Sequence, residues 1–304
     1  MFAVITISFI LLRLAPGDPV SIMLLAAQDD LGGVGSVQEF DALREELGFD
    51  LPIYQQYFAY LLNVIQGDLG YSFHSGRPVA ELILRNLPAT LILALAGMSV
   101  AIVIGVLAGT VAALHRNTAY DYVITTFTLF ALSAPNFWLG ILLLYAASFQ
   151  LGWFPVVDRS TDDIGRQLHQ LVLPALVVGT NASALIARVA RSSMLDVLSL
   201  DYVRTARAKG LLERVINFRH ALPNAAIPVV TIGGLTFANL LGGAVVIEVV
   251  FARQGLGRLV VEAVYNRDYS VVQGAIVVMV FFVILTNIAV DVLYTFLDPR
   301  IRYD

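Results

Sequence analysis

Six long apolar stretches constrain this chain more than any other feature of its sequence. A helix needs roughly 20 apolar residues to cross about 30 Å of hydrocarbon. The composition agrees with a membrane location, since only 14% of residues are charged, against about 25% in soluble domains. The sequence therefore predicts an all-α polytopic membrane protein with six transmembrane helices, near residues 1–14, 87–113, 122–149, 170–195, 222–250 and 271–296.

The first stretch is shorter than the others. Its 14 residues span only about 21 Å at about 1.5 Å per residue. A signal peptide would carry a charged n-region and a small-residue cleavage site, and residues 1–14 have neither. We expect a first transmembrane helix whose cytoplasmic start is absent from this chain, through truncation or start-codon choice.

Basic residues set the expected orientation. Seven of them lie between positions 188 and 219, against three acidic residues. The positive-inside rule places such a segment in the cytoplasm. With six spans, both termini are then cytoplasmic. The expected divisions are an extracytoplasmic insert over 15–86, a transmembrane core over 87–296 with a cytoplasmic loop at 196–221, and a cytoplasmic tail over 297–304.

The insert carries signals of local structure. A Pro-Gly-Asp-Pro turn at 16–19 leaves the membrane, and an amphipathic stretch follows at 37–47. An apolar helix is expected over 53–65, ending at Gly67 to Gly70. Residues 15–86 are therefore expected to form a small, partly folded unit over the membrane entrance.

The most informative stretch of the cytoplasmic loop runs from Asp201 to Gly210. Asp201 can cap a short helix, and Gly210 can end it with a left-handed turn. At helical spacing, Tyr202, Ala206 and Lys209 share one face. A second short helix is expected over 211–220. Such a helix, held against the membrane by spans on both sides, is a lever for a soluble partner; the alternative is a basic loop that only fixes topology.

This stretch resembles the EAA loop of the binding-protein-dependent ABC importer permeases, whose pattern is E-A-A-x3-G-x9-I-x-L-P. Aligned on Gly210, the alanines fall at Thr205 and Ala206, and Leu-Pro falls at 222–223. Arg204 stands where the pattern has glutamate, and His220 where it has isoleucine.

Further motifs resemble the dipeptide, oligopeptide, glutathione and nickel branch of these permeases. The run Tyr-Val-Arg-Thr-Ala-Arg-Ala-Lys-Gly at 202–210 is typical of that branch. Six other motifs agree with it: LAPGDP at 14–19, GDLG at 67–70, SGRPV at 75–79, LP at 173–174, GLGR at 255–258 and DPRIR at 298–302. The resemblance covers the chain from Leu11 onward.

The resemblance implies a type I ABC importer permease in the cytoplasmic (inner) membrane of a prokaryote. It implies a heterodimer with a homologous second permease, two cytoplasmic ATPase subunits, and an extracytoplasmic solute-binding protein. Short peptides are the expected substrate, with glutathione and nickel complexes as alternatives. The ATPase-coupling element would consist of Tyr202, Arg204, Thr205, Ala206, Arg207, Ala208, Lys209 and Gly210.

The sequence places the motor elsewhere. A Walker A loop requires Gly-Lys-Ser/Thr, and the only lysine, Lys209, lies between alanine and glycine. We therefore expect no enzyme activity and no bound cofactor in this chain, with ATP and magnesium on partner ATPases.

Four polar residues within the spans are candidates for a translocation pathway: Asn136, Asn181, Thr236 and Asn239. Polar groups inside a span face a cavity or another helix. The alternative to a hydrated pathway is hydrogen bonding between helices. Asn136 follows Pro135, which frees backbone groups that neighbouring helices or water can satisfy. Gly105 and Gly109 predict a helix-packing seam.

Two carboxylates within the spans are candidates for a gate or an ion pair. Glu248 lies near the outer end of the fifth span, where Arg253 or Arg258 could neutralise it, and Asp291 lies near the inner end of the sixth. A proton-coupling carboxylate would instead indicate a secondary transporter, the main alternative function. No histidine spacing indicates a metal site, and no constellation indicates a catalytic one. Trp138 and Trp153 are expected to anchor the interface.

Overall fold

The computed structural model describes residues 2–14, 50–155 and 163–297. The predicted turn at 16–19, the amphipathic stretch at 37–47 and the tail from residue 298 lie outside the described residues. Within these ranges every regular element is a helix, apart from one isolated bridge between Tyr71 and Pro78. The all-α fold is confirmed.

Four helices in the described residues are long and apolar enough to cross a membrane. They are Val79–Leu114, Ile164–Leu198, Glu213–Val250 and Tyr269–Val292, and a bent pair of helices counts as a fifth. The first predicted span is a helix, α1 (Phe2–Leu14), but its 13 residues are too few to cross the hydrocarbon core.

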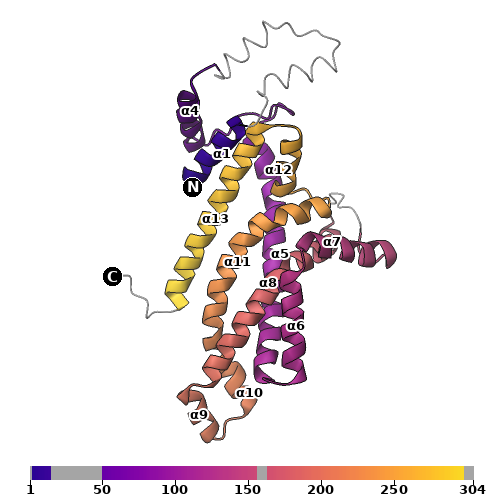
Figure 1. Ribbon diagram of the computed structural model, residues 1–304, viewed down its shortest axis with the longest axis vertical. Helices are drawn as coiled ribbons and strands as arrows, with labels where there is room; N and C mark the ends of the chain where they lie inside the picture. The colour runs from indigo at the N-terminus through magenta and orange to yellow at the C-terminus, as the bar shows by residue number, and fades with distance from the viewer. Residues whose placement is uncertain (1, 15–49, 156–162, 298–304) are drawn as a thin grey trace. The chain divides into compact units, whose positions relative to one another are not determined.

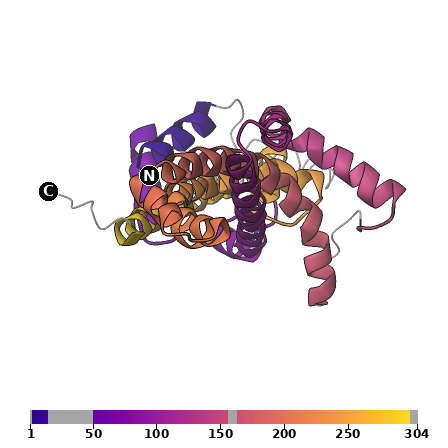
Figure 2. The ribbon, with the colours of Figure 1, turned by 90° about the horizontal axis from the view of Figure 1, so that it is seen from below.

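The span predicted over 122–149 is not one continuous helix but a bent pair of helices. The angle between α6 (Ala119–Ser133) and the helix that begins at Asn136 is 103°. Figure 1 shows α6 and α7 running in different directions, and Figure 2 shows the same part of the chain from below. A proline lacks the amide hydrogen and pushes the residue before it into an extended conformation. Ala134, with φ −75° and ψ 127°, has that conformation. The chain resumes as α7 (Asn136–Leu143) and then as η1 (Leu144–Gln150), a segment of wider i→i+5 turns.

The chain divides into two compact units. One comprises Met1–Pro88 and Gly255–Phe281, and the other comprises Ala89–Gln254 and Phe282–Asp304. Two long helices, α5 (Val79–Leu114) and α13 (Tyr269–Leu297), contribute to both units.

The first unit contains α1, α4 (Ile53–Ile65), the start of α5, α12 (Leu256–Tyr265) and the first part of α13. The predicted helix over 53–65 is confirmed with these bounds. Valine, isoleucine, leucine and alanine side chains from α5, α12 and α13 form the core: Val79, Ile83, Leu256, Ala263, Val271, Val272 and Ala275.

Asp268 ties two parts of this unit together. Its buried carboxylate accepts a hydrogen bond from the Ser72 hydroxyl at 2.5 Å and from the amides of Phe73 and His74 at 3.3 Å. The same carboxylate accepts from the Val271 amide at 3.4 Å, in the first turn of α13. One side chain therefore serves both the start of this helix and the turn before α5.

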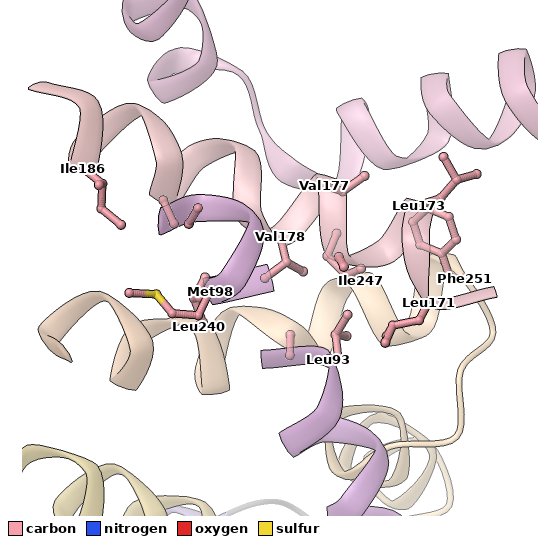
Figure 3. Packing of buried hydrophobic residues seen from close by; sticks show 14 of the residues in the cluster. Leu93, Met98, Leu171, Leu173, Val177, Val178, Ile186, Leu240, Ile247 and Phe251 are labelled. Carbon is pink, nitrogen blue, oxygen red and sulfur yellow. The ribbon is translucent and has the colours of Figure 1, made fainter. Parts of the chain in front are cut away.

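The second unit is built around α8 (Ile164–Leu198), which packs against α6 and α11 (Leu222–Val250). Figure 3 shows side chains of α5, α8 and α11 meeting in its core, among them Leu93, Val178 and Ile247. This apolar cluster packs α8 against α5 and α11, and α6 also contacts α8.

Glycines bring α5 and α8 into backbone contact. A Cβ atom on Gly105 would lie 2.7 Å from the Ser183 carbonyl oxygen, and one on Gly109 would lie 2.4 Å from the Ala187 carbonyl oxygen. Real Cβ atoms do not come this close, so only glycine fits at either position. The predicted packing seam at Gly105 and Gly109 is confirmed.

Candidate functional site

The predicted lever is a short helix, α9 (Asp201–Ala208), joined to the end of α8 by Ser199 and Leu200. Val203 is fully buried, and α9 packs against η2 (Ile216–Ala221), the segment of wide turns that leads into α11. The role of Val203 as the anchor of this helix was not predicted from the sequence. Its signal was a single branched apolar residue in an otherwise charged and polar stretch.

Gly210 ends α9 as predicted. Its φ of +77° is left-handed, a conformation that costs a residue with a Cβ roughly 1–2 kcal/mol. The amides of Gly210 and Leu211 bond to the carbonyl oxygens of Arg207 and Ala206 at 2.9 and 3.3 Å. The left-handed turn is therefore confirmed.

The predicted cap at Asp201 is wrong. Leu200 occupies the N-cap position with extended backbone, and no side-chain cap bond forms. Asp201 is already helical, so its carboxylate cannot reach back to the first amides. It lies instead 3.4 Å from Nη1 of Arg204, with both side chains exposed.

A polar clamp of Tyr202, His220 and Asn224 joins the start of α9 to α11. The side-chain amide of Asn224 donates to the His220 carbonyl oxygen at 2.7 Å and to the Tyr202 hydroxyl oxygen at 3.2 Å. The Tyr202 hydroxyl donates to the same carbonyl at 3.4 Å. His220 enters this clamp through its backbone, so its side-chain identity does not decide the contact.

An ion pair joins the other end of α9 to the same region. Nε of Arg207 lies 2.8 Å from Oε1 of Glu213 across the Gly210 turn. Hydrogen bonding to Glu213 raises the pKa of Arg207 above its ordinary value. Because both side chains are partly exposed, such a pair contributes at most about 1 kcal/mol.

The prediction of a separate second helix over 211–220 is wrong. α10 (Glu213–Val215), η2 and α11 run on without interruption, so Glu213–Val250 forms one helix of 38 residues. Leu222 and Pro223 occupy its interior, where proline cannot donate a backbone bond. The wide turns of η2 lie just before this proline. The clamp of Tyr202, His220 and Asn224 and the ion pair of Arg207 and Glu213 therefore both connect α9 to the helix that continues as a membrane span.

The side of α9 that faces away from the buried Val203 is exposed, and its two charged residues, Asp201 and Arg204, pair with each other. Arg204, Thr205, Ala208 and Lys209 are all exposed, and the Arg204 side chain is 71% exposed. Ser199 and Leu200 connect α9 to α8, and side-chain contacts connect α9 to the helix that continues as α11. A force that a soluble partner applies to α9 can therefore reach two spans at once.

Asn181, a predicted pathway residue, bonds to the break in α6 and α7. Its side-chain amide donates to the carbonyl oxygens of Ala131 and Leu132 at 3.4 and 3.3 Å. In an unbroken helix these carbonyls would receive the amides of residues 135 and 136, and Pro135 has none. Of the two alternatives for the groups freed by Pro135, a neighbouring helix or water, the structure shows the first, and Asn181 of α8 supplies the donor.

A cavity of about 300 Å³ lies at the same break. Aromatic and small side chains line it: Phe130, Ser133, Ala134, Pro135, Phe137 and Trp138. Asn136, half-buried at the first position of α7, sits in sequence between two of these residues. The two remaining pathway candidates, on α11, differ in environment, since Thr236 is buried and Asn239 is exposed.

The two candidate carboxylates also lie in different surroundings. Glu248 is fully buried and accepts a hydrogen bond from the Thr90 hydroxyl of α5 at 2.5 Å. Asp291 on α13 is exposed. Arg258 pairs with Glu262 at 2.6 Å. The predicted role of Glu248 and Asp291 as gate residues stays a prediction. Among the residues that the structure describes, no group of three or more His, Cys, Asp or Glu side chains could hold a metal ion.

Two family models match the chain. Residues 101–303 match the binding-protein-dependent transport system inner membrane component, and residues 1–94 match the N-terminal part of such membrane components.

Curated relatives match over nearly their whole length. The chain is 40% identical to an oligopeptide transport system permease protein, AppB of Bacillus subtilis, over 100% of this chain and 95% of that one. It is 41% identical to a glutathione transport system permease protein, GsiC of Escherichia coli strain K12, with the same coverage. It is 42% identical to a di/tripeptide transport system permease protein, DppB of Pseudomonas aeruginosa, over 99% and 95%.

Among solved structures, the fold is similar to a chain of the inward-facing MetNI methionine ABC transporter. The TM-score is 0.59 at 19% identity, covering 71% of this chain and 96% of that chain. At that identity the likeness shows a shared fold alone.

Proposed function

Because the chain belongs to the family of inner membrane components of binding-protein-dependent transport systems, we propose that α9 is the contact through which a separate ATPase drives its transport cycle. The chain itself is a transport permease subunit. The single observation that carries the coupling role is that α9 is connected at both its ends to the helix that continues as α11, through the clamp of Tyr202, His220 and Asn224 and through the ion pair of Arg207 with Glu213.

The proposed machine contains this chain, a homologous second permease, two cytoplasmic ATPase subunits and an extracytoplasmic solute-binding protein. ATP and magnesium bind to the ATPases. The exposed side of α9 docks in a groove of one ATPase, with Gly210 ending the docking helix. In this proposal α9 lies on the cytoplasmic side of the membrane with the ATPases, and both termini are cytoplasmic. The excess of basic residues between 188 and 219 favours this orientation.

We propose short peptides as the transported substrate. Three relatives that match almost the whole chain carry oligopeptides, di- and tripeptides, or glutathione by name, and glutathione is itself a small peptide. Nickel complexes stay as the alternative that the sequence motifs left open. Asn136, Asn181, Thr236 and Asn239 are proposed to border the pathway, with Glu248 and Asp291 as gate residues.

Replacements at Gly210 test the coupling role. No atom lies within 4 Å of the place that a Cβ would occupy at Gly210. A side chain there would not clash, so its effect within this chain would come from strain in the left-handed backbone. Gly210→Val strains the left-handed turn, whereas Gly210→Asn tolerates it. In proteoliposomes with the ATPases, the second permease and the binding protein, we expect valine to abolish uptake while the subunit stays inserted, and asparagine to retain it.

Two outcomes would overturn this proposal. Undiminished peptide uptake by Gly210→Val would show that the turn is not needed for coupling. Uptake by this chain alone, driven by a proton gradient without ATP, would establish a secondary transporter instead.

A further inference from the structure

α4 has three distinct sides, and only one of them packs against other residues that the structure describes. The packed side faces α1: Tyr57 lies 5.4 Å from Phe9 between ring centroids, and its hydroxyl lies 2.6 Å from that of Thr6. Tyr60 stacks on Phe9 at 5.7 Å. These contacts fix the rotation of α4 about its own axis.

The second side of α4 is apolar and uncovered. Tyr54, Phe58, Leu62 and Ile65 recur at spacings of four, four and three residues, so they form one stripe. They are 58–80% exposed. The third side is polar but carries no charge, with Gln55, Ala59, Asn63 and Gln66 all exposed. The chain therefore presents an amphipathic helix whose apolar stripe has no cover among the described residues.

The length of α4 excludes a span. Its 13 residues cover about 20 Å at about 1.5 Å per residue, well short of the roughly 30 Å hydrocarbon core. An amphipathic helix of this kind can lie in the plane of the interface, with its apolar face in the boundary between headgroups and acyl chains. Tyrosine is enriched at that depth, and α4 carries Tyr54, Tyr57 and Tyr60.

The residues of the stripe favour lipid over a second protein. Helix–helix interfaces in membranes are enriched in small residues that let backbones approach, and this stripe contains only large ones. The neighbouring helix α1 also exposes large apolar residues, since Ile7 and Ile10 are 56% and 47% exposed. Both helices thus present large apolar side chains that have no cover among the described residues.

We propose that α4 lies in the membrane interface, with the stripe of Tyr54, Phe58, Leu62 and Ile65 inserted among the lipids and the neutral polar side facing water. Since the helix bears no charge, insertion depends on apolar burial rather than on attraction to anionic headgroups. Residues 53–65 then act as an interfacial anchor for α1, and not as a part of the insert that stands free of the membrane. The proposal is independent of ATPase coupling.

The absence of cysteine makes a single-cysteine test direct. The full chain carries Phe58→Cys or Leu62→Cys on the stripe, with Gln55→Cys or Asn63→Cys as matched controls on the polar side. Each is labelled with an environment-sensitive nitrobenzoxadiazole probe in phosphatidylcholine nanodiscs. We expect blue-shifted emission and quenching by spin-labelled lipid at positions 58 and 62, and quenching by aqueous iodide at 55 and 63.

Added phosphatidylglycerol should leave this pattern unchanged. Equal iodide quenching at all four positions would overturn the proposal, because the stripe would then face water. Protection of positions 58 and 62 that requires the second permease would also overturn it, in favour of a protein contact. Positions 58 and 62 lie on the same stripe, so the two variants test the same expectation. One poorly folded variant therefore does not decide the result.

Discussion

Arg191 of α8 holds Asp121 of α6 in a two-point ion pair, with Nε and Nη2 of the guanidinium each 2.7 Å from one carboxylate oxygen. The Asp121 side chain is 4% exposed and that of Arg191 is 31% exposed. The same carboxylate accepts from the Asn117 amide at 3.1 Å, which fixes the turn between α5 and α6. One pair thus joins α6 to α8 and to the turn between α5 and α6.

Breaking this pair should destabilise the subunit. Asp121→Asn or Arg191→Gln leaves one charge without its partner, and the expected loss in unfolding free energy is about 2–4 kcal/mol. The value lies at the lower end for buried pairs because Arg191 is partly exposed. Thermal unfolding in detergent, followed by tryptophan fluorescence, measures it. Arg188→Gln, at an exposed position of the same helix, is the control, and an equal loss there would refute the assignment.

A second bond between the same helices lies at the other end of α6. Asn181→Leu should cost about 1–2 kcal/mol, since the carbonyl oxygens of Ala131 and Leu132 lose their donor in an apolar setting. Pro135→Ala returns an amide that can reach Ala131. The double variant should therefore lose less than the sum of the single losses in a double-mutant cycle. Strict additivity would mean that Asn181 does not compensate for the proline.

Glycine replacements on two helices should act with opposite sign. Gly109→Ala puts a Cβ 2.4 Å from the Ala187 carbonyl oxygen, and the overpacking should cost about 1–3 kcal/mol. Gly243→Ala on α11 meets no atom within 4 Å and should gain up to about 1 kcal/mol from helix propensity. Both values refer to unfolding of the isolated chain. A harmless alanine at position 109 would contradict the close approach of α5 and α8.

The predictions from sequence succeeded where hydropathy or backbone chemistry decides the outcome alone. Long apolar runs predicted the helices, the glycines predicted the seam, and Gly210 predicted a left-handed turn. Pro135 carried a signal for freed carbonyls, but not for the 103° bend, because proline in a membrane helix is often accommodated by a modest kink.

What failed depended on contacts distant in sequence. The clamp between Tyr202 and Asn224 follows from the packing of α9 on η2, which no local pattern encodes. Val203 stood out as the one branched apolar residue of α9, but the sequence did not name the segment it packs against. Asp201 failed as a cap because one residue of shift in the helix start moves the capping position to Leu200. The Asp121–Arg191 pair joins residues 70 positions apart, and neither has a sequence neighbour that marks it.

Alkaline pH should loosen the packing of α1 on α4 through Tyr60. Burial raises the pKa of Tyr60 to about 12 from an ordinary 10.0. Below pH 10 the phenol is neutral whether or not the helices are packed, so stability does not change there. Between pH 10 and 12 an undocked Tyr60 would release its proton before the packed one. Stability therefore falls with rising pH, by at most about 2–3 kcal/mol.

Difference absorbance of tyrosinate between the parent chain and Tyr60→Phe measures this titration directly. The difference should develop near pH 12, and Tyr60→Phe should retain its ring stack on Phe9 while losing the contribution of Tyr60 to alkaline destabilisation. A difference signal that develops near pH 10 would show that water reaches the Tyr60 hydroxyl. The two helices would then not form the packed pair on which the rotation of α4, and with it the orientation of its apolar stripe, depends.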